Sequence, residues 1–312
     1  MDIFWAILLL VAGFALTIKG ADFIIKAASW FADVTGVSKA VIGATVVAFA
    51  TSASEFFVSL FAVLKGYGDI SMGNIVGSNI VNLGIGFAII AIWRPHSASG
   101  TLSMIRKVFA LSATITVLVF AFLGFVSIYF AIALLLIFVV YTFIQIKYEK
   151  ETEKPPRKKT NAKEIIINVV LFVLGIAGAV FGSNIIVDSA KTLGTAIGIS
   201  DYVIGITIVA IGSSLDDIIT SIVALVKKEN DMSVGNLIGS NIFNITFVLG
   251  AIALASGGIS IASNVAYIDL PFAMGFLVIA VGPTLITKKI QRFQGYLLAA
   301  AYVGYITVLC IL

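Results

Sequence analysis

Cysteine, histidine and charged side chains are scarce in this chain of 312 residues. One cysteine, Cys310, and one histidine, His96, exclude a disulfide framework and a zinc site built from Cys and His clusters. Only 12% of the residues are charged and 60% are hydrophobic, whereas a soluble domain has about 25% charged residues. The composition therefore indicates a polytopic membrane protein, and the formal net charge of +4 does not indicate binding to nucleic acid.

Apolar segments of membrane-spanning length recur along the whole chain, separated by Gly, Pro and charged residues. Because a spanning helix needs about 20 apolar residues, we predict an all-α polytopic membrane protein with ten transmembrane helices. The predicted spans are 3–32, 36–64, 69–93, 104–122, 125–146, 164–195, 198–226, 231–256, 264–285 and 290–311.

One strongly polar segment, residues 147–163, lies between the fifth and sixth predicted spans. It holds seven of the 20 Lys and Arg residues, so the positive-inside rule predicts that this linker is cytoplasmic. It divides the chain into a first five-helix half, 1–146, and a second five-helix half, 164–312. With ten spans, both termini lie outside the plasma membrane and the two halves have opposite orientations.

An internal repeat relates the two halves. Residues 41–82 match residues 203–244 at a constant offset of 162 positions. The match begins with VIGATVVAFATSASEFFVS against VIGITIVAIGSSLDDIITS, and it ends with SMGNIVGSNIVN against SVGNLIGSNIFN. Combined with opposite orientations, this pattern predicts two inverted five-helix repeats. Many secondary transporters have this organisation, with the binding site near the bilayer midplane.

Each repeat places one acid deep within an apolar segment: Glu55 in the first and Asp217 at the matching position of the second. A charge near the bilayer centre costs about 2.5–3.5 kcal/mol even on lenient scales, so a partner or a bound ion must offset it. The sequence has no Lys or Arg near either acid in the second, third, seventh or eighth span. We therefore predict that the two acids bind a cation.

Oxygen-bearing side chains accompany both acids. Helical spacing places Thr51 on the face of Glu55 and Ser213 on the face of Asp217, and the glycine-rich stretches can free backbone carbonyls. An all-oxygen ligand set suits a hard cation such as Ca²⁺, which takes about 6–8 oxygens. Any one of these hydroxyls alone is better explained by helix packing. The candidate metal ligands are Glu55, Asp217, Thr51, Ser213, Ala48 and Ala210.

The duplicated acidic and GNxxGSNI blocks resemble the α-repeats of the Ca²⁺/cation antiporter superfamily, which includes sodium/calcium and proton/calcium exchangers. The resemblance is to archaeal or bacterial members and covers almost the whole chain. It implies that Glu55 and Asp217 coordinate Ca²⁺ and that the hydroxyls of Thr51 and Ser213 share that site. It also implies that the first and sixth helices slide across the core to alternate access. Neighbouring positions, including those implied for a counter-ion, are Ser52, Ser214, Ser78, Asn82, Ser240, Asn244 and Asp216.

The coupling ion depends on how the acidic blocks differ from the family pattern. Sodium-coupled members typically read Gly-Thr-Ser-x-Pro-Glu, whereas both blocks here lack the proline. Asp216 adds an acid where the first repeat has Ser54, and it is a candidate second ligand, proton acceptor or vestibule residue. These departures favour H⁺. The hydroxyl pairs, which are retained where proton-coupled members often have Gly-Asn, keep a Na⁺/Ca²⁺ exchanger as the alternative. The position that carries an acid in some sodium exchangers is Asn244 here, which cannot titrate.

The expected function is secondary active antiport of Ca²⁺ against H⁺ or Na⁺ by alternating access, not an enzymatic reaction, and we expect no cofactor. The expected partners are the lipid bilayer and inorganic cations, and the sequence leaves the oligomeric state undefined. A divalent cation channel and a structural membrane scaffold are alternatives from other classes. A channel would carry Ca²⁺ without a counter-ion gradient, and a scaffold would tolerate neutralisation of both acids.

Overall fold

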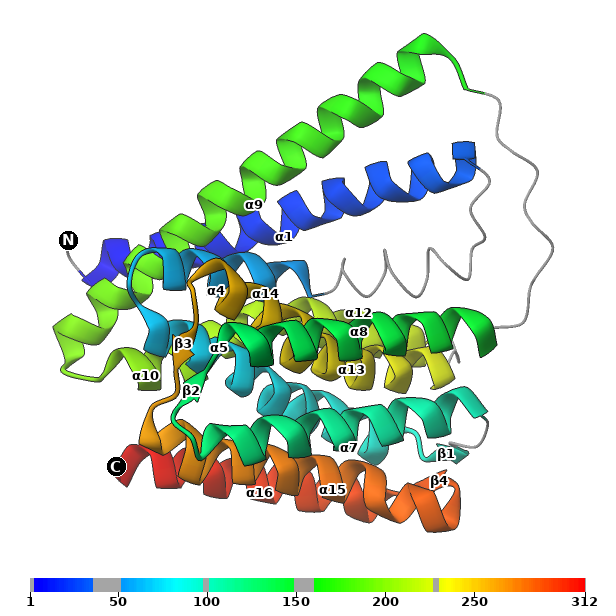
Figure 1. Ribbon diagram of the computed structural model, residues 1–312, viewed down its shortest axis with the longest axis vertical. Coiled ribbons are helices and arrows are strands. Elements are labelled where there is room, and N and C mark those ends of the chain that lie inside the picture. Colours follow the sequence, from blue (N-terminus) through cyan, green and yellow to red (C-terminus); the bar gives the residue numbers. More distant parts are fainter. Residues whose placement is uncertain (1–2, 36–51, 98–100, 149–159, 227–229, 312) are drawn as a thin grey trace.

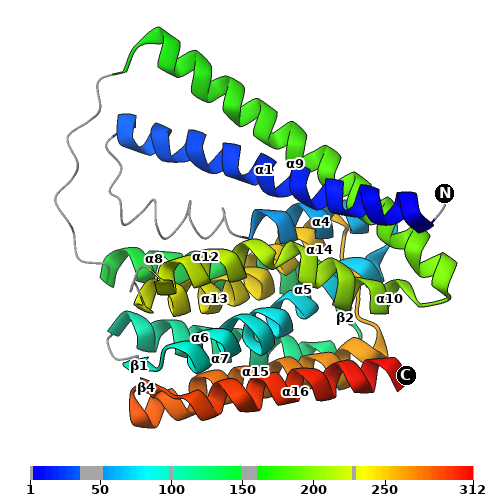
Figure 2. The same cartoon turned by 180° about the vertical axis from the view of Figure 1, so that it is seen from behind.

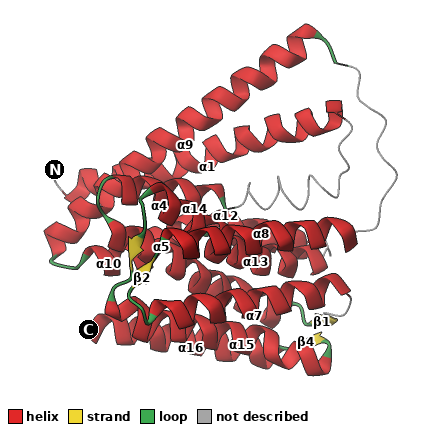
Figure 3. Ribbon diagram, viewed as in Figure 1, coloured by secondary structure: helices red, strands yellow, loops and turns green. Residues whose placement is uncertain are grey.

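The computed structural model describes residues 3–35, 52–97, 101–148, 160–226 and 230–311, and the remaining residues are drawn as a thin grey trace (Figure 1). The described residues are almost entirely helical, with short strands near the ends of the helix bundle (Figure 3). This architecture agrees with the apolar composition, because a helix satisfies its backbone hydrogen bonds within a lipid environment.

The first half consists of α-helices and one π-helical segment, η2, among the described residues. These elements are α1 (Ile3–Thr35), α4 (Ala53–Leu64), α5 (Gly68–Val81), η2 (Asn82–Phe87), α6 (Ala88–Trp93), α7 (Thr101–Ala121) and α8 (Ile128–Tyr148). The second half contains three π-helical segments. Its elements are α9 (Ala162–Ile197), α10 (Asp201–Ile204), η3 (Gly205–Val209), α11 (Ala210–Ser213), α12 (Leu215–Val226), α13 (Asn230–Phe243), η4 (Asn244–Val248), α14 (Leu249–Ala255), η5 (Val265–Asp269), α15 (Leu270–Thr287) and α16 (Arg292–Ile311).

Helix is present in each of the ten predicted ranges. Among the described residues, eight helical segments have the length and hydropathy to cross a membrane. The other two ranges contain α4, whose 12 described residues form a shorter apolar helix, and the 20-residue α16. The chain is therefore a mainly helical multi-pass membrane protein. Exactly ten crossings, arranged as two inverted halves, stay a prediction.

Two antiparallel strand pairs lie at opposite ends of the bundle (Figure 1). They are β1 (His96–Ser97) with β4 (Lys289–Ile290), and β2 (Phe125–Val126) with β3 (Ile259–Ser260). Each pair joins a loop of the first half to a loop of the second half. The two halves are therefore linked to each other at both ends of the bundle.

Helices α1 and α9 form an antiparallel pair along one side of the molecule, and they diverge from the other helices toward one end (Figures 1 and 2). Glycines bring their backbones together. A Cβ added at Gly20 would lie 2.6 Å from the Gly175 carbonyl oxygen, and one added at Gly13 would lie 3.0 Å from that of Gly182. The two contacts correspond under the offset of 162 positions, so the pair packs with the symmetry of the sequence repeat.

Helix α5 runs through the centre of the bundle and is buried from Ile70 to Val81. Its glycines meet the second half: a Cβ added at Gly73 would lie 2.8 Å from the backbone nitrogen of Ile206, and one at Gly77 would lie 2.7 Å from the carbonyl oxygen of Ile206. This close approach brings the polar side chains of α5 against the segment that leads to Asp217.

Candidate cation site

The two intramembrane acids occupy matching positions at the starts of two helices. Glu55 is in the first turn of α4 and Asp217 is in the first turn of α12, and both are fully buried. Ser52 precedes α4 with φ −102° and ψ 14°, and Ser214 separates α11 from α12 with φ −82° and ψ −2°. Each acid therefore lies in the first turn of its helix, where backbone amides favour negative charge, and Asp217 follows a local break at Ser214.

The Glu55 carboxyl group has little hydrogen bonding for a fully buried acid. Its Oε2 accepts a hydrogen bond from Ser54 Oγ at 2.9 Å, and its Oε1 has no hydrogen-bond partner among the described residues. Ser54 Oγ also lies 3.0 Å from the carbonyl oxygen of Ser213, which it can donate to. Ser54 thus links the acid of the first repeat to the residue that precedes the break in the second repeat.

The Asp217 carboxylate is better satisfied. Its Oδ1 accepts a hydrogen bond from Ser240 Oγ at 2.8 Å, and its Oδ2 accepts one from Asn82 Nδ2 at 2.9 Å. Ser240 comes from the second half and Asn82 from the first half. Two predicted site residues that lie far apart in the sequence therefore meet at one carboxylate.

Ser213 connects the two halves beside these acids. Its hydroxyl donates to Asn74 Oδ1 at 2.9 Å and lies 3.2 Å from Ser78 Oγ and 3.3 Å from the carbonyl oxygen of Ala210. The structure thus places Ser213, Ser78 and the Ala210 carbonyl in one group of oxygen atoms.

Several other buried oxygens have no hydrogen-bond partner within the part of the chain that the structure describes. They include the hydroxyls of Ser52 and Ser214 and the Oδ1 atoms of Asn82 and Asn244. An unsatisfied buried polar group costs about 1–3 kcal/mol. A bound cation would satisfy buried oxygens of this kind.

Three predicted site residues need separate mention. Thr51 and Ala48 lie outside the described residues. Asp216 is next to Asp217 on α12 but is only half-buried, so its environment is more open than that of either intramembrane acid.

Two asparagines that were not among the predicted site residues hold the turns that carry the acids. Asn74 Nδ2 donates to the carbonyl oxygen of Glu55 at 3.3 Å, and Asn236 Nδ2 donates to that of Asp217 at 3.1 Å. Each amide also donates to a serine one turn after the acid, Ser59 on α4 at 2.8 Å and Ser221 on α12 at 3.0 Å. Both occupy the same position of the duplicated GNxxGSNI block, and that duplication was the signal that could have identified them.

A second asparagine pair joins α5 to α13. Asn79 Nδ2 donates to the carbonyl oxygen of Asn241 at 3.2 Å, and Asn241 Nδ2 donates to that of Asn79 at the same distance. The reciprocal bonds relate positions 162 residues apart. The π-helical segments η2 and η4 also begin at matching positions, Asn82 and Asn244. Such π segments occur frequently at functional sites because they disrupt the regular hydrogen-bond ladder.

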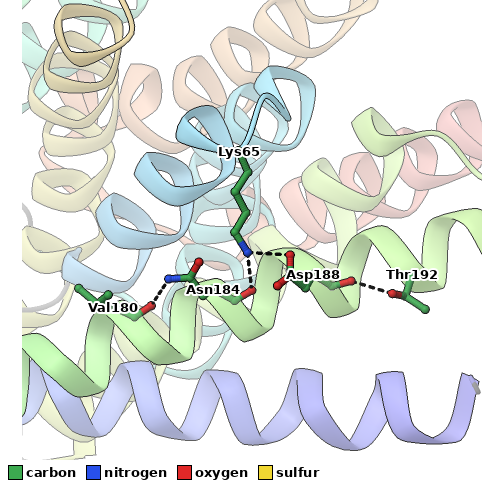
Figure 4. A network of polar contacts seen from close by, with 5 residues as sticks. All are labelled: Lys65, Val180, Asn184, Asp188 and Thr192. Atoms are coloured by element: carbon green, nitrogen blue, oxygen red, sulfur yellow. Dashed lines mark hydrogen bonds and ion pairs between the residues drawn. The ribbon is translucent and has the colours of Figure 1, made fainter. Parts of the chain in front are cut away.

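Helix α9 is tied to the site-bearing helices by ion pairs. Lys65, at the end of α4, donates to Asp188 Oδ1 at 2.7 Å and to the carbonyl oxygen of Asn184 at 3.3 Å (Figure 4). Further along α9, Lys191 pairs with Asp201 of α10 at 2.6 Å. Helix α9 is thus linked to α4, which carries Glu55, and to α10, which begins the helical stretch that leads to Asp217.

Comparison with known proteins identifies related membrane exchangers. The family model described as sodium/calcium exchanger protein matches residues 5–147 and 167–311. The putative antiporter CaxA of Alkalimonas amylolytica is 31% identical, and the alignment covers 96% of this chain and 97% of CaxA. A structure of the sodium-calcium exchanger NCX_Mj is 30% identical, with a TM-score of 0.67 over 98% of this chain and 99% of that chain. The crystal structure of the H⁺/Ca²⁺ exchanger CAX is 18% identical and shares the fold, with a TM-score of 0.82 over 97% of this chain and 82% of that chain.

Proposed function

The chain belongs to the sodium/calcium exchanger protein family, and on that premise we propose that it is a secondary active antiporter that moves Ca²⁺ across the plasma membrane in exchange for a monovalent cation. One observation above all supports the proposal: Glu55 is fully buried in a membrane protein and its Oε1 has no hydrogen-bond partner among the described residues. A bound cation would supply the charge that such an acid needs.

The proposed Ca²⁺ site lies between the two acids. Two carboxylates balance a divalent charge, and Ca²⁺ accepts about 6–8 oxygen ligands from carboxylates, hydroxyls and carbonyls. The contact of Ser54 with the Ser213 carbonyl, and the contacts of the Ser213 hydroxyl with Asn74 and Ser78, support a site formed by both halves. The proposed ligands are Glu55, Asp217, Thr51, Ser213 and the backbone carbonyls of Ala48 and Ala210.

For the coupling ion, the sequence favours H⁺. Protons compete with Ca²⁺ by neutralising the same carboxylates, and Asp216 provides an additional half-buried acid beside Asp217. Exchange follows if the protein changes its conformation only when the charge of the site is compensated by one ion class or the other. On this proposal, Asp216 and the two intramembrane acids carry the proton dependence.

Na⁺ is the second candidate, and a specific observation favours it. Neutral oxygens of Ser52, Ser214 and Asn244 are buried, have no hydrogen-bond partner among the described residues and do not titrate, so they suit a monovalent metal ion better than a proton. The 30% identity to a sodium-calcium exchanger supports the same choice. The proposed counter-ion positions are Ser52, Ser214, Ser78, Asn82, Ser240, Asn244 and Asp216.

The proposed topology keeps the division into halves 1–146 and 164–312 around a cytoplasmic linker, 147–163, with both termini outside. The family match supports the division, because its two segments leave out residues 148–166. The reciprocal bonds between Asn79 and Asn241 support an inverted repeat around a central axis.

Uptake of radioactive Ca²⁺ into proteoliposomes, driven separately by an imposed Na⁺ gradient and an imposed pH gradient, tests the function. Antiport predicts uptake only with a counter-ion gradient, and equal uptake without any gradient would instead indicate a channel. Uptake that persists with Na⁺ after the pH gradient is collapsed selects Na⁺ over H⁺. Glu55→Gln and Asp217→Asn should abolish uptake, whereas Asp69→Asn, which neutralises an exposed acid in the first turn of α5, should not.

A further inference from the structure

A third buried acid, Asp269, lies outside the proposed cation site. It is fully buried at the end of η5, and each of its carboxyl oxygens accepts a hydrogen bond from a phenol. Tyr305 donates to Oδ1 at 2.8 Å, and Tyr202 donates to Oδ2 in a short hydrogen bond. Both carboxyl oxygens of this buried acid therefore have a hydrogen-bond donor.

The Asp269 cluster, formed by Asp269, Tyr202 and Tyr305, joins three helical segments. Tyr305 belongs to α16 and Asp269 directly precedes α15, whereas Tyr202 belongs to α10. The α15–α16 side is well packed, because the Tyr305 ring lies 5.1 Å from that of Phe272 and is 1% exposed. Tyr202 is therefore hydrogen-bonded to a closely packed pair of helices.

Helix α10 begins the helical stretch that carries the second half of the site. From Tyr202 the chain continues through η3 and α11 to Ser213, about three turns further on. The residue before Tyr202, Asp201, accepts hydrogen bonds from Lys191 of α9 at 2.6 Å and 2.8 Å. The first turn of this stretch thus lies between α9 on one side and the α15–α16 pair on the other.

The cluster is not part of the duplicated cation machinery. At the offset of 162 positions that relates the two blocks, Tyr202 corresponds to Ala40, which provides no phenol. The hydrogen bonds that hold Tyr202 therefore belong to one repeat only. A role in that repeat alone is consistent with the different surroundings of Asp217 and Glu55.

We propose that Asp269 is a positioning residue that fixes α10 to α15 and α16 through Tyr202, and thereby holds Ser213 and Asp217 in place for Ca²⁺. This inference depends on the proposed function, because it assigns Ca²⁺ binding to Ser213 and Asp217. Two phenol hydrogen bonds to one buried carboxyl group are strong in a medium of low dielectric constant. A shift of α10 toward α9 would displace Ser213 from its contacts with Asn74 and Ser78.

The test compares Tyr202→Phe with Tyr305→Phe, which remove one hydroxyl each. Tyr202→Phe should raise the Ca²⁺ concentration for half-maximal uptake about tenfold, with little change in maximal rate. A tenfold change corresponds to the lower end of the range for a hydrogen bond to a carboxylate. Tyr305→Phe should change it less, because the bond from Asp269 to α10 is kept. Tyr267→Phe is the matched control, since this tyrosine lies on η5 but is 64% exposed.

Amide hydrogen exchange of residues 201–213, measured without Ca²⁺, is the second readout. Tyr202→Phe should speed exchange there, and Tyr267→Phe should not. The inference is overturned if Tyr202→Phe leaves both the exchange rate and the Ca²⁺ concentration for half-maximal uptake unchanged. It is also overturned if Tyr202→Phe and Tyr305→Phe only lower the amount of folded protein, and do so to the same extent. If the wild-type protein shows no gradient-driven uptake, the proposed function fails, while the exchange measurement still tests the link between Asp269 and α10.

Discussion

Replacement of Glu55 by glutamine should have opposite effects on stability without and with Ca²⁺. The Glu55 carboxyl group is fully buried, accepts one hydrogen bond from Ser54, and leaves Oε1 without a partner among the described residues. Glutamine has nearly the same size but no charge. Without Ca²⁺, the substitution removes an uncompensated buried charge and should stabilise the protein, whereas it should also remove the stabilisation by Ca²⁺.

The expected magnitudes follow from the burial of Glu55. An unsatisfied buried polar group costs about 1–3 kcal/mol. Glutamine recovers only part of this cost, because its own amide NH2 group needs an acceptor, so we expect the free energy of unfolding to rise by about 1 kcal/mol. Saturating Ca²⁺, at about 100 times its Kd, should stabilise the wild-type protein by about 2.7 kcal/mol. Loss of one of two carboxylates should weaken Ca²⁺ binding at least about 100-fold, since a charge pair about 4 Å apart contributes about 4 kcal/mol at an effective dielectric constant of about 20.

Thermal unfolding of the purified protein at alkaline pH, over a series of Ca²⁺ concentrations, measures both effects. Wild type should show a Tm that rises with Ca²⁺, and Glu55→Gln should start from a higher Tm that does not respond to Ca²⁺. Asp69→Asn, which neutralises an exposed acid, should behave like wild type. A Glu55→Gln variant that keeps the response to Ca²⁺, or that is less stable than wild type without Ca²⁺, would refute the reasoning.

Three further predictions use other parts of the structure. Asp217→Asn should lower the Tm without Ca²⁺, in contrast to Glu55→Gln, because an amide cannot accept both hydrogen bonds that the carboxylate accepts; thermal unfolding measures this. Gly20→Ala should destabilise the α1–α9 contact by about 1–3 kcal/mol, whereas Gly275→Ala, with open space around its added Cβ, should not; a similar Tm for both variants would contradict the prediction. Lys65→Asp should change the transport rate by up to about fivefold, because an exposed ion pair contributes up to about 1 kcal/mol. The charge-swapped double variant, Lys65→Asp with Asp188→Lys, should restore the rate.

The membrane class, the helical architecture and the two acids follow from the sequence alone. Apolar segments of spanning length determine the helices because lipid leaves few other ways to satisfy the backbone. The offset of 162 positions pairs Glu55 with Asp217 because the duplication preserves register. The same register could have identified Asn74 and Asn236, whose amides hold the turns of the two acids.

Only the tertiary structure decides how differently the two acids are surrounded. Asp217 accepts a hydrogen bond from Asn82, 135 positions away, whereas Glu55 keeps one oxygen unpaired within the described residues. Likewise, Asp269 meets Tyr202 and Tyr305 only because three helical segments converge. Local propensity and periodicity describe each helix separately, but these contacts depend on how the helices cross. The repeat therefore determines that there are two acids, and the packing of the helices determines that they are not equivalent.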